Sequence, residues 1–156
     1  MEGLSKNQNG GIMKLPEYVT KAEVQKVCKA LGLRDWTKIT KPNVTLKEAK
    51  RILREIDTRG LKIEPEQFRA GLDVELEHGT MYKEANVTNN HPVITGKIVL
   101  AHMIESLDYY RRLEVAELEG DLHKSIVSGN SAKARNYYKR ITKAKTELAE
   151  AEGKKL

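Results

Sequence analysis

Apolar residues along the chain recur at helical spacing, and two stretches open with the same polar signal. Thr20 with Glu23, and Thr45 with Glu48, form capping-box patterns, in which each side chain bonds to the backbone N–H of the other residue. The apolar residues that follow lie on one helix face: Val24, Val27, Cys28 and Leu31 in the first stretch, and Ala49, Ile52, Leu53 and Ile56 in the second. The pattern predicts one helix ending at Gly32 and another ending near residues 58–60.

Two proline signals predict the next helices. Pro65 follows Glu64 at an early helical position, and the apolar pattern runs from there to His78, with Gly79 as the expected stop. Residues 79–91 are rich in Asn and Thr and predict a polar loop. Pro92 then restarts an apolar helical pattern, which we expect to bend near Ser106 and to continue to about residue 126.

The last part of the chain predicts a long helical hairpin. Residues 128–131, Ser-Gly-Asn-Ser, have the composition of a turn and a helix cap. A final helix is expected over about residues 132–151, with an apolar stripe of fewer than three heptads. Two long helices joined by so short a turn pack antiparallel. The stripe would serve either this packing within the chain or an oligomer seam.

The expected fold is therefore all-α: a small helical bundle with a long antiparallel C-terminal helical hairpin. Residues 1–15 are predicted to be a flexible N-terminal arm, residues 16–127 a helical core domain, and residues 128–156 the amphipathic helix that packs back. No apolar run approaches the roughly 20 residues that a membrane-spanning helix needs, so no membrane partner is expected.

Charge is distributed in blocks. The chain has 156 residues and a net charge of +6, but residues 1–60 carry 13 basic and 7 acidic side chains, residues 61–131 carry 7 and 12, and residues 132–156 carry 8 and 3. Blocks of alternating sign favour self-association or matching within the chain. Basic ends leave nucleic-acid binding as an alternative. The single cysteine, Cys28, excludes an intrachain disulfide and a cysteine-based zinc site.

One group of residues has the chemistry of a site. Glu75 and His78 are three residues apart on one predicted helix, and His102 and Glu105 are three apart on the next, so each pair shares a helix face. Facing each other, they would offer two imidazoles and two carboxylates to zinc, iron or manganese. Additional candidate ligands lie nearby, His91 and Glu77. The alternatives are a buried His/Glu network without a metal, and unrelated surface groups.

Other catalytic patterns fail. Thr95-Gly96-Lys97 resembles the end of a phosphate-binding loop, but the preceding glycines and strand are absent. The sequence has no Gly-x-Ser-x-Gly and no His-Glu-x-x-His. No catalytic residue and no cofactor are therefore assigned, and a non-enzymatic protein is the favoured interpretation.

Several blocks of sequence, in order, resemble a family of small bacterial and tailed-phage proteins that is catalogued as a domain of unknown function. The resemblance covers about residues 45–115, and its blocks read GLDVELEHGT from Gly71, then NVT, TGKI, LAH and DYY-x-RL. It implies a bacterial or phage source, and it implies motif positions for Glu75, Glu77, His78, His102 and Glu105. This sequence departs from the pattern at Met81 and at Asn90-His91, which puts a complete metal or catalytic site in doubt.

The leading functional hypothesis is a non-enzymatic helical protein that acts through protein–protein contacts, as a homo-oligomer or as a structural or accessory component of a phage virion. The first alternative is a metal-binding protein that uses the Glu-x-x-His and His-x-x-Glu residues. The second is a nucleic-acid-associated protein that uses the basic ends. The expected location is the bacterial cytoplasm or the virion.

Overall fold

The computed structural model describes residues 15–155, and within them all regular structure is helical. The helices are α1 (Lys21–Leu31), α2 (Leu46–Leu53), α3 (Pro65–Met81), α4 (Pro92–Glu105), α5 (Tyr109–Val127) and α6 (Ser131–Gly153), with short 3-10 helices η1 (Trp36–Lys38) and η2 (Lys83–Ala85). The all-α fold and the C-terminal hairpin are confirmed. All but the last residue of the predicted arm, residues 1–15, lies outside the described residues.

The predicted N-caps start both helices, but only α2 has the complete capping box, since α1 has the Thr20 half alone. Thr20 Oγ1 accepts a hydrogen bond from the Glu23 N–H at 3.2 Å. Both bonds of the capping box between Thr45 and Glu48 are present. Gly32 ends α1 with φ at 67°, in the left-handed region that glycine adopts without steric cost. Local polar chemistry therefore fixes where α1 and α2 begin.

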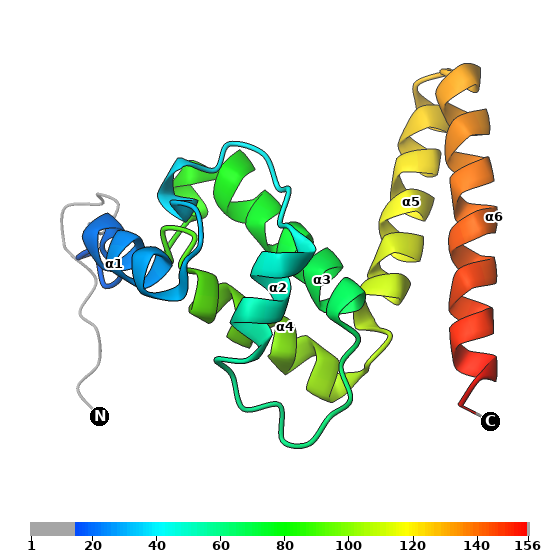
Figure 1. Ribbon diagram of the computed structural model, residues 1–156. Helices are drawn as coiled ribbons and strands as arrows, with labels where there is room; N and C mark the ends of the chain where they lie inside the picture. The colour runs from blue at the N-terminus through cyan, green and yellow to red at the C-terminus, as the bar shows by residue number, and fades with distance from the viewer. Residues whose placement is uncertain (1–14, 156) are drawn as a thin grey trace, which may run out of the picture.

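α3 is the centre of the main core. Its buried residues Phe68, Leu72 and Leu76 form one stripe, and α2 and α4 pack against it (Figure 1). Trp36 from η1 is fully buried in the same core. Gly71 lets α5 approach α3, because a Cβ there would lie 2.7 Å from the Tyr110 ring. The first turn of α5 is thereby anchored to the globule.

Three expected helix boundaries are wrong. α2 ends at Leu53 with Arg54 as its C-cap, not near residues 58–60, so Ile56 lies beyond the helix. α3 continues through Gly79 to Met81, and the glycine serves a close approach rather than a helix end: an added Cβ would lie 2.2 Å from Asn90 Oδ1. The expected bend near Ser106 is a complete break between α4 and α5. Ser106 is extended, with φ −156° and ψ 126°, and its hydroxyl accepts from the Asp108 N–H at 3.3 Å.

α5 and α6 form a hairpin that stands to one side of the globule (Figure 1). Gly129, with φ 69°, makes the turn, and Asn130 caps α6 by accepting from the Lys133 N–H. The hairpin has its own small core of Leu118, Ile141 and Ala144. No helix in the described part of the chain is both long and apolar enough to cross a bilayer.

Candidate functional site

Glu75 is the centre of the group that the sequence singled out. α3 carries it toward the start of α5, where only 13% of its side chain is exposed. Its Oε1 accepts a hydrogen bond from the Tyr110 hydroxyl at 2.8 Å. His102 Nε2 lies 3.6 Å from the same oxygen, and His78 Nδ1 lies 3.8 Å from Oε2. α3, α4 and α5 therefore meet at one carboxylate.

Two tyrosines hold the His102 imidazole in place. The ring stacks on Tyr109 with a centroid distance of 4.1 Å and an interplanar angle of 8°. Tyr110 meets the same imidazole edge-on, at 6.1 Å. Burial and the neighbouring Glu75 carboxylate raise the pKa of Tyr110 well above its ordinary value of 10.0, so its hydroxyl stays a proton donor. A network of aromatic and polar contacts thus joins α3 to the α4–α5 break.

Of the other predicted site residues, Glu105, Glu77 and His91 lie apart from this centre. Glu105 is the last residue of α4 and is exposed, as is Glu77 on α3. His78 is near Glu75, although 69% of its side chain is exposed. His91 caps α4, because its Nδ1 accepts from the Ile94 N–H at 3.3 Å. The structure therefore gathers Glu75, His78 and His102 and leaves Glu105 outside the group.

Within residues 15–155, no group of three or more His, Cys, Asp or Glu side chains is arranged to hold a metal ion. Glu75 already uses one oxygen to accept a hydrogen bond from the Tyr110 hydroxyl. The group therefore consists of a hydrogen-bonded carboxylate, that of Glu75, with the His78 and His102 imidazoles on either side. That this group binds zinc, iron or manganese stays a prediction, which elemental analysis of the purified protein can test.

A small pocket of about 160 Å³ opens beside Glu75 and His78. The loop after α3 forms its far wall: Asn86 donates to the Gly79 carbonyl at 3.2 Å and to Asn90 Oδ1 at 3.1 Å. Sequence reasoning treated this loop as a polar connection and missed its part in the pocket. Its Asn content was the available signal, because Asn tolerates the positive φ of 61° that Asn90 adopts.

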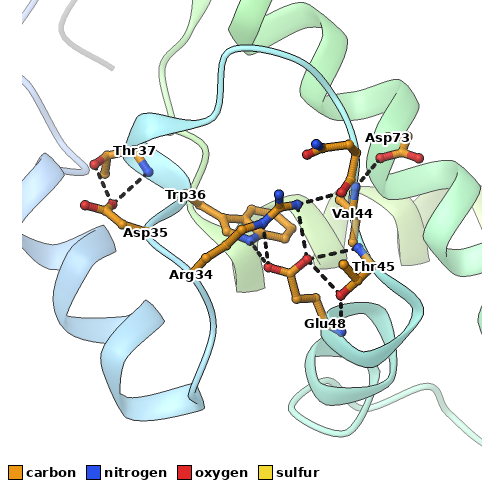
Figure 2. Close-up of polar contacts among 9 residues, drawn as sticks. Arg34, Asp35, Trp36, Thr37, Val44, Thr45, Glu48 and Asp73 are labelled. Carbon is orange, nitrogen blue, oxygen red and sulfur yellow. Dashed lines mark hydrogen bonds and ion pairs between the residues drawn. The ribbon is translucent and has the colours of Figure 1, made fainter.

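A second polar centre, around Glu48, was also missed. Figure 2 shows the Arg34 guanidinium and the Trp36 indole directed at this carboxylate from the segment after α1. Arg34 donates through Nε to Oε1 at 2.9 Å and through Nη2 to Oε2 at 3.2 Å, and Trp36 Nε1 donates at 3.2 Å. Thr45 adds its N–H at 2.9 Å and its hydroxyl at 3.0 Å. The capping box thus also ties α2 to the Arg34–Trp36 segment.

The same contacts control the charge of Glu48. Burial alone would raise its pKa, but the hydrogen bonds from Thr45, Trp36 and Arg34 outweigh burial and hold the pKa below the ordinary 4.5. Nearby, Asp73 on α3 accepts from the Val44 N–H at 2.7 Å (Figure 2). Glu48 is therefore a charged residue whose carboxylate is held in place by hydrogen-bond donors from three neighbouring residues. The Glu75 group stays the candidate site.

Comparison with known proteins identifies a family. The family model described as "Protein of unknown function (DUF5661)" matches residues 24–119. The match begins inside α1, earlier than the expected limit of about 45, and ends within α5, so α6 lies outside it. No curated protein and no solved structure matches the chain. Because the matched region is more than half of the 156 residues, the chain belongs to the DUF5661 family of proteins of unknown function.

Proposed function

We propose that this protein is a non-enzymatic helical module that acts through protein–protein contacts, with the α5–α6 hairpin as its contact surface and a second copy of the chain as its partner. One observation carries the proposal. Helices of 19 and 23 residues share a core of three buried apolar residues, against which three partly buried ones pack: Val115, Leu122 and Tyr137. Because helices in proteins are stabilised mainly by packing of an apolar face, a hairpin with so small a core gains stability from further contacts.

The hairpin also exposes large apolar side chains. Ile126 and Val127, beside the turn, are 62% and 74% exposed, and Tyr138 on α6 is 65% exposed. The turn lies at the end of the hairpin remote from the α4–α5 junction (Figure 1). Tyr138 is of a residue type that is enriched among interface anchors, and the neighbouring Ile126 and Val127 expose apolar surface that a partner could cover.

Charge complementarity favours a second copy as the partner. Residues 131–146 carry six basic side chains and no acidic one. Of these six, Lys145 pairs with α5, through Glu119 at 2.7 Å, among the described contacts. On α5, burial first, and then Glu77 of α3 and Asp121, raise the pKa of Glu117, so acidic groups from α3 and α5 lie near one another. Two hairpins related by a twofold axis would place the basic face of each beside the acidic face of the other.

The test is self-association measured by sedimentation equilibrium. Replacing both tip residues, Ile126→Ser with Val127→Ser, should weaken the dimer by about tenfold or more, because each lost apolar anchor is worth roughly 1 kcal/mol. Val87→Ser is the matched control, since Val87 is 75% exposed but lies outside the hairpin. Equal dimer dissociation constants for the tip variant and the control would contradict the proposal that the hairpin is the contact surface.

The resemblance to bacterial and tailed-phage proteins supports a setting for this module, namely a virion or the bacterial cytoplasm in which virions assemble. In that setting the protein is a structural or accessory component of the particle. Mass spectrometry of purified particles tests this part separately. A fixed copy number per particle is the expected result, and absence from particles would contradict it.

The acid-free basic stretch of α6 favours nucleic-acid binding as a second candidate function. Arg135, Lys139 and Lys143 are exposed and follow one another at four-residue spacing, so they share a helix face. Binding to duplex DNA should then weaken steeply with salt. Replacing the three by Gln should reduce the salt dependence, and absence of binding at low salt would end this candidate.

The metal-binding alternative rests on the approach of His78 and His102 to the Glu75 carboxylate. Elemental analysis of protein purified without chelator tests it. Stoichiometric zinc, iron or manganese that is lost in Glu75→Gln would support it. Metal-free protein with no thermal shift on adding these ions would exclude it.

A further inference from the structure

A second, larger pocket lies at the opposite end of α3 from Pro65, between segments that are distant in sequence. It has a volume of about 500 Å³ and is lined by the first residue of α1, the segment from Thr37 to Thr40, the end of α3 and the loop from Lys83 to Asn90. The volume is within the range of roughly 300–1,000 Å³ typical of small-molecule sites. Its position is independent of the hairpin proposed above as the protein contact surface.

Three lysines from three elements line this pocket: Lys21 of α1, Lys38 of η1 and Lys83 of η2. Its lining includes no Asp or Glu, whereas four other pockets in the described part of the chain each include at least one. Lys38 is exposed and lies 3.7 Å from the half-buried Asp35 carboxylate, which is a long pair. Within residues 15–155, Lys21 and Lys83 form no ion pair with a carboxylate.

The polar wall between the lysines is held in place. Asn89 Nδ2 donates to the Val19 carbonyl at 2.6 Å and to Glu17 Oε1 at 2.5 Å, which ties the loop to the segment before α1. The Glu17 carboxylate is thus hydrogen-bonded to the wall, although Glu17 does not line the pocket. Asn86 donates to the Gly79 carbonyl, so this acceptor at the end of α3 is already occupied. Thr37 donates to Asp35 at 2.6 Å. The wall is therefore shaped before any ligand arrives, while the flexible lysines supply donors and positive charge.

We propose that this pocket binds a small ligand that carries a diphosphate or triphosphate group. Three ammonium groups around a polar hollow match the charge of such a group, and lysine binds phosphate as a compact point charge. A pocket with unpaired carboxylates would repel the same ligand. Free pyrophosphate and the phosphates of a nucleotide share this chemistry, and the test separates them.

The experiment is calorimetric titration of the full chain at low ionic strength with pyrophosphate, with ATP and with a short DNA duplex. Saturable binding of pyrophosphate or ATP is expected, tighter for ATP if the pocket also contacts the nucleoside. The triple variant Lys21→Gln, Lys38→Gln, Lys83→Gln should bind about tenfold more weakly, as expected from the loss of three exposed charge contacts. All three side chains are exposed, so the fold should be unaffected.

The matched control is Lys29→Gln, Lys97→Gln, Lys133→Gln, which removes the same charge from exposed lysines outside the pocket. Unchanged affinity in the control is expected. An equal loss in both triple variants would show diffuse attraction rather than a site and would overturn the proposal. So would an absence of pyrophosphate and ATP binding, including the case in which only the duplex binds.

Discussion

Removal of the Glu48 carboxylate is the perturbation whose cost the structure defines best. Glu48→Ala leaves the buried Trp36 indole N–H without an acceptor, which costs about 1–3 kcal/mol. It also removes one bond of the capping box, the one that Glu48 accepts from the Thr45 N–H, at about 0.5–1.5 kcal/mol. Thr45 still caps α2 through the backbone N–H of residue 48. Arg34 is 39% exposed and keeps the Asn43 carbonyl at 2.6 Å, so its guanidinium adds less than about 1 kcal/mol. The free energy of unfolding should fall by about 2–4 kcal/mol.

Urea denaturation followed by circular dichroism measures this loss, which should move the midpoint without changing the slope m. Glu55→Ala is the control. Glu55 forms an exposed i,i+4 pair with Arg51, and such pairs contribute about 0.3–0.5 kcal/mol. A loss below about 1 kcal/mol for Glu48→Ala, or one equal to that of the control, would refute the reasoning.

The same residue predicts a pH dependence. The pKa of Glu48 is lower in the folded chain than its ordinary 4.5, so its contribution to stability is present above that value. As the pH falls below about 4.5, the unfolded chain takes up the proton first, and the contribution is lost toward the folded pKa. The stability difference between the unchanged protein and Glu48→Gln should therefore be largest near neutral pH and shrink in acid.

Three further outcomes are expected from unfolding measurements. Gly79→Ala should destabilise the protein, because the added Cβ would overlap the Asn90 side chain. Gly120 lies in open space within α5, so Gly120→Ala should stabilise the protein by about 0.5–1 kcal/mol. A higher stability for Gly79→Ala than for Gly120→Ala would contradict this packing. Burial lowers the pKa of His91, so stability should decline as the pH falls below its ordinary 6.5, and His91→Asn, which keeps a cap acceptor, should abolish that decline. Tyr110→Phe removes the hydrogen bond to Glu75 and should cost about 1–2 kcal/mol, with no loss if the hydroxyl is unimportant.

The elements that sequence predicted correctly are those whose signals are local. Thr45 and Glu48 are three residues apart, and their capping box follows from that spacing alone. The short turn before α6, residues 128–130, likewise requires the antiparallel hairpin. What the sequence could not predict depends on contacts between distant residues. Arg34 and Trp36 reach Glu48 across a loop, and no periodicity in the chain indicates that they do.

The candidate site illustrates the same limit. Helical spacing correctly predicted that Glu75 and His78 share a face, and the packing of α4 brings His102 to them. His102 and Glu105 also share a spacing of three, yet α4 ends at Glu105 and leaves it in solvent. The expected helix end at Gly79 was wrong for a related reason. Glycine often ends a helix, but it also lets another segment approach the helix closely. Only the position of Asn90 in the fold distinguishes the two roles.

The molar mass of the unchanged full chain in solution, measured by light scattering during size-exclusion chromatography, tests the proposed hairpin contact most directly. We expect a molar mass twice that of the single chain at low salt. This mass should fall toward that of the single chain as salt screens the attraction between the basic and acidic faces. A single-chain mass at every protein and salt concentration would contradict the proposal that the α5–α6 hairpin pairs with a second copy.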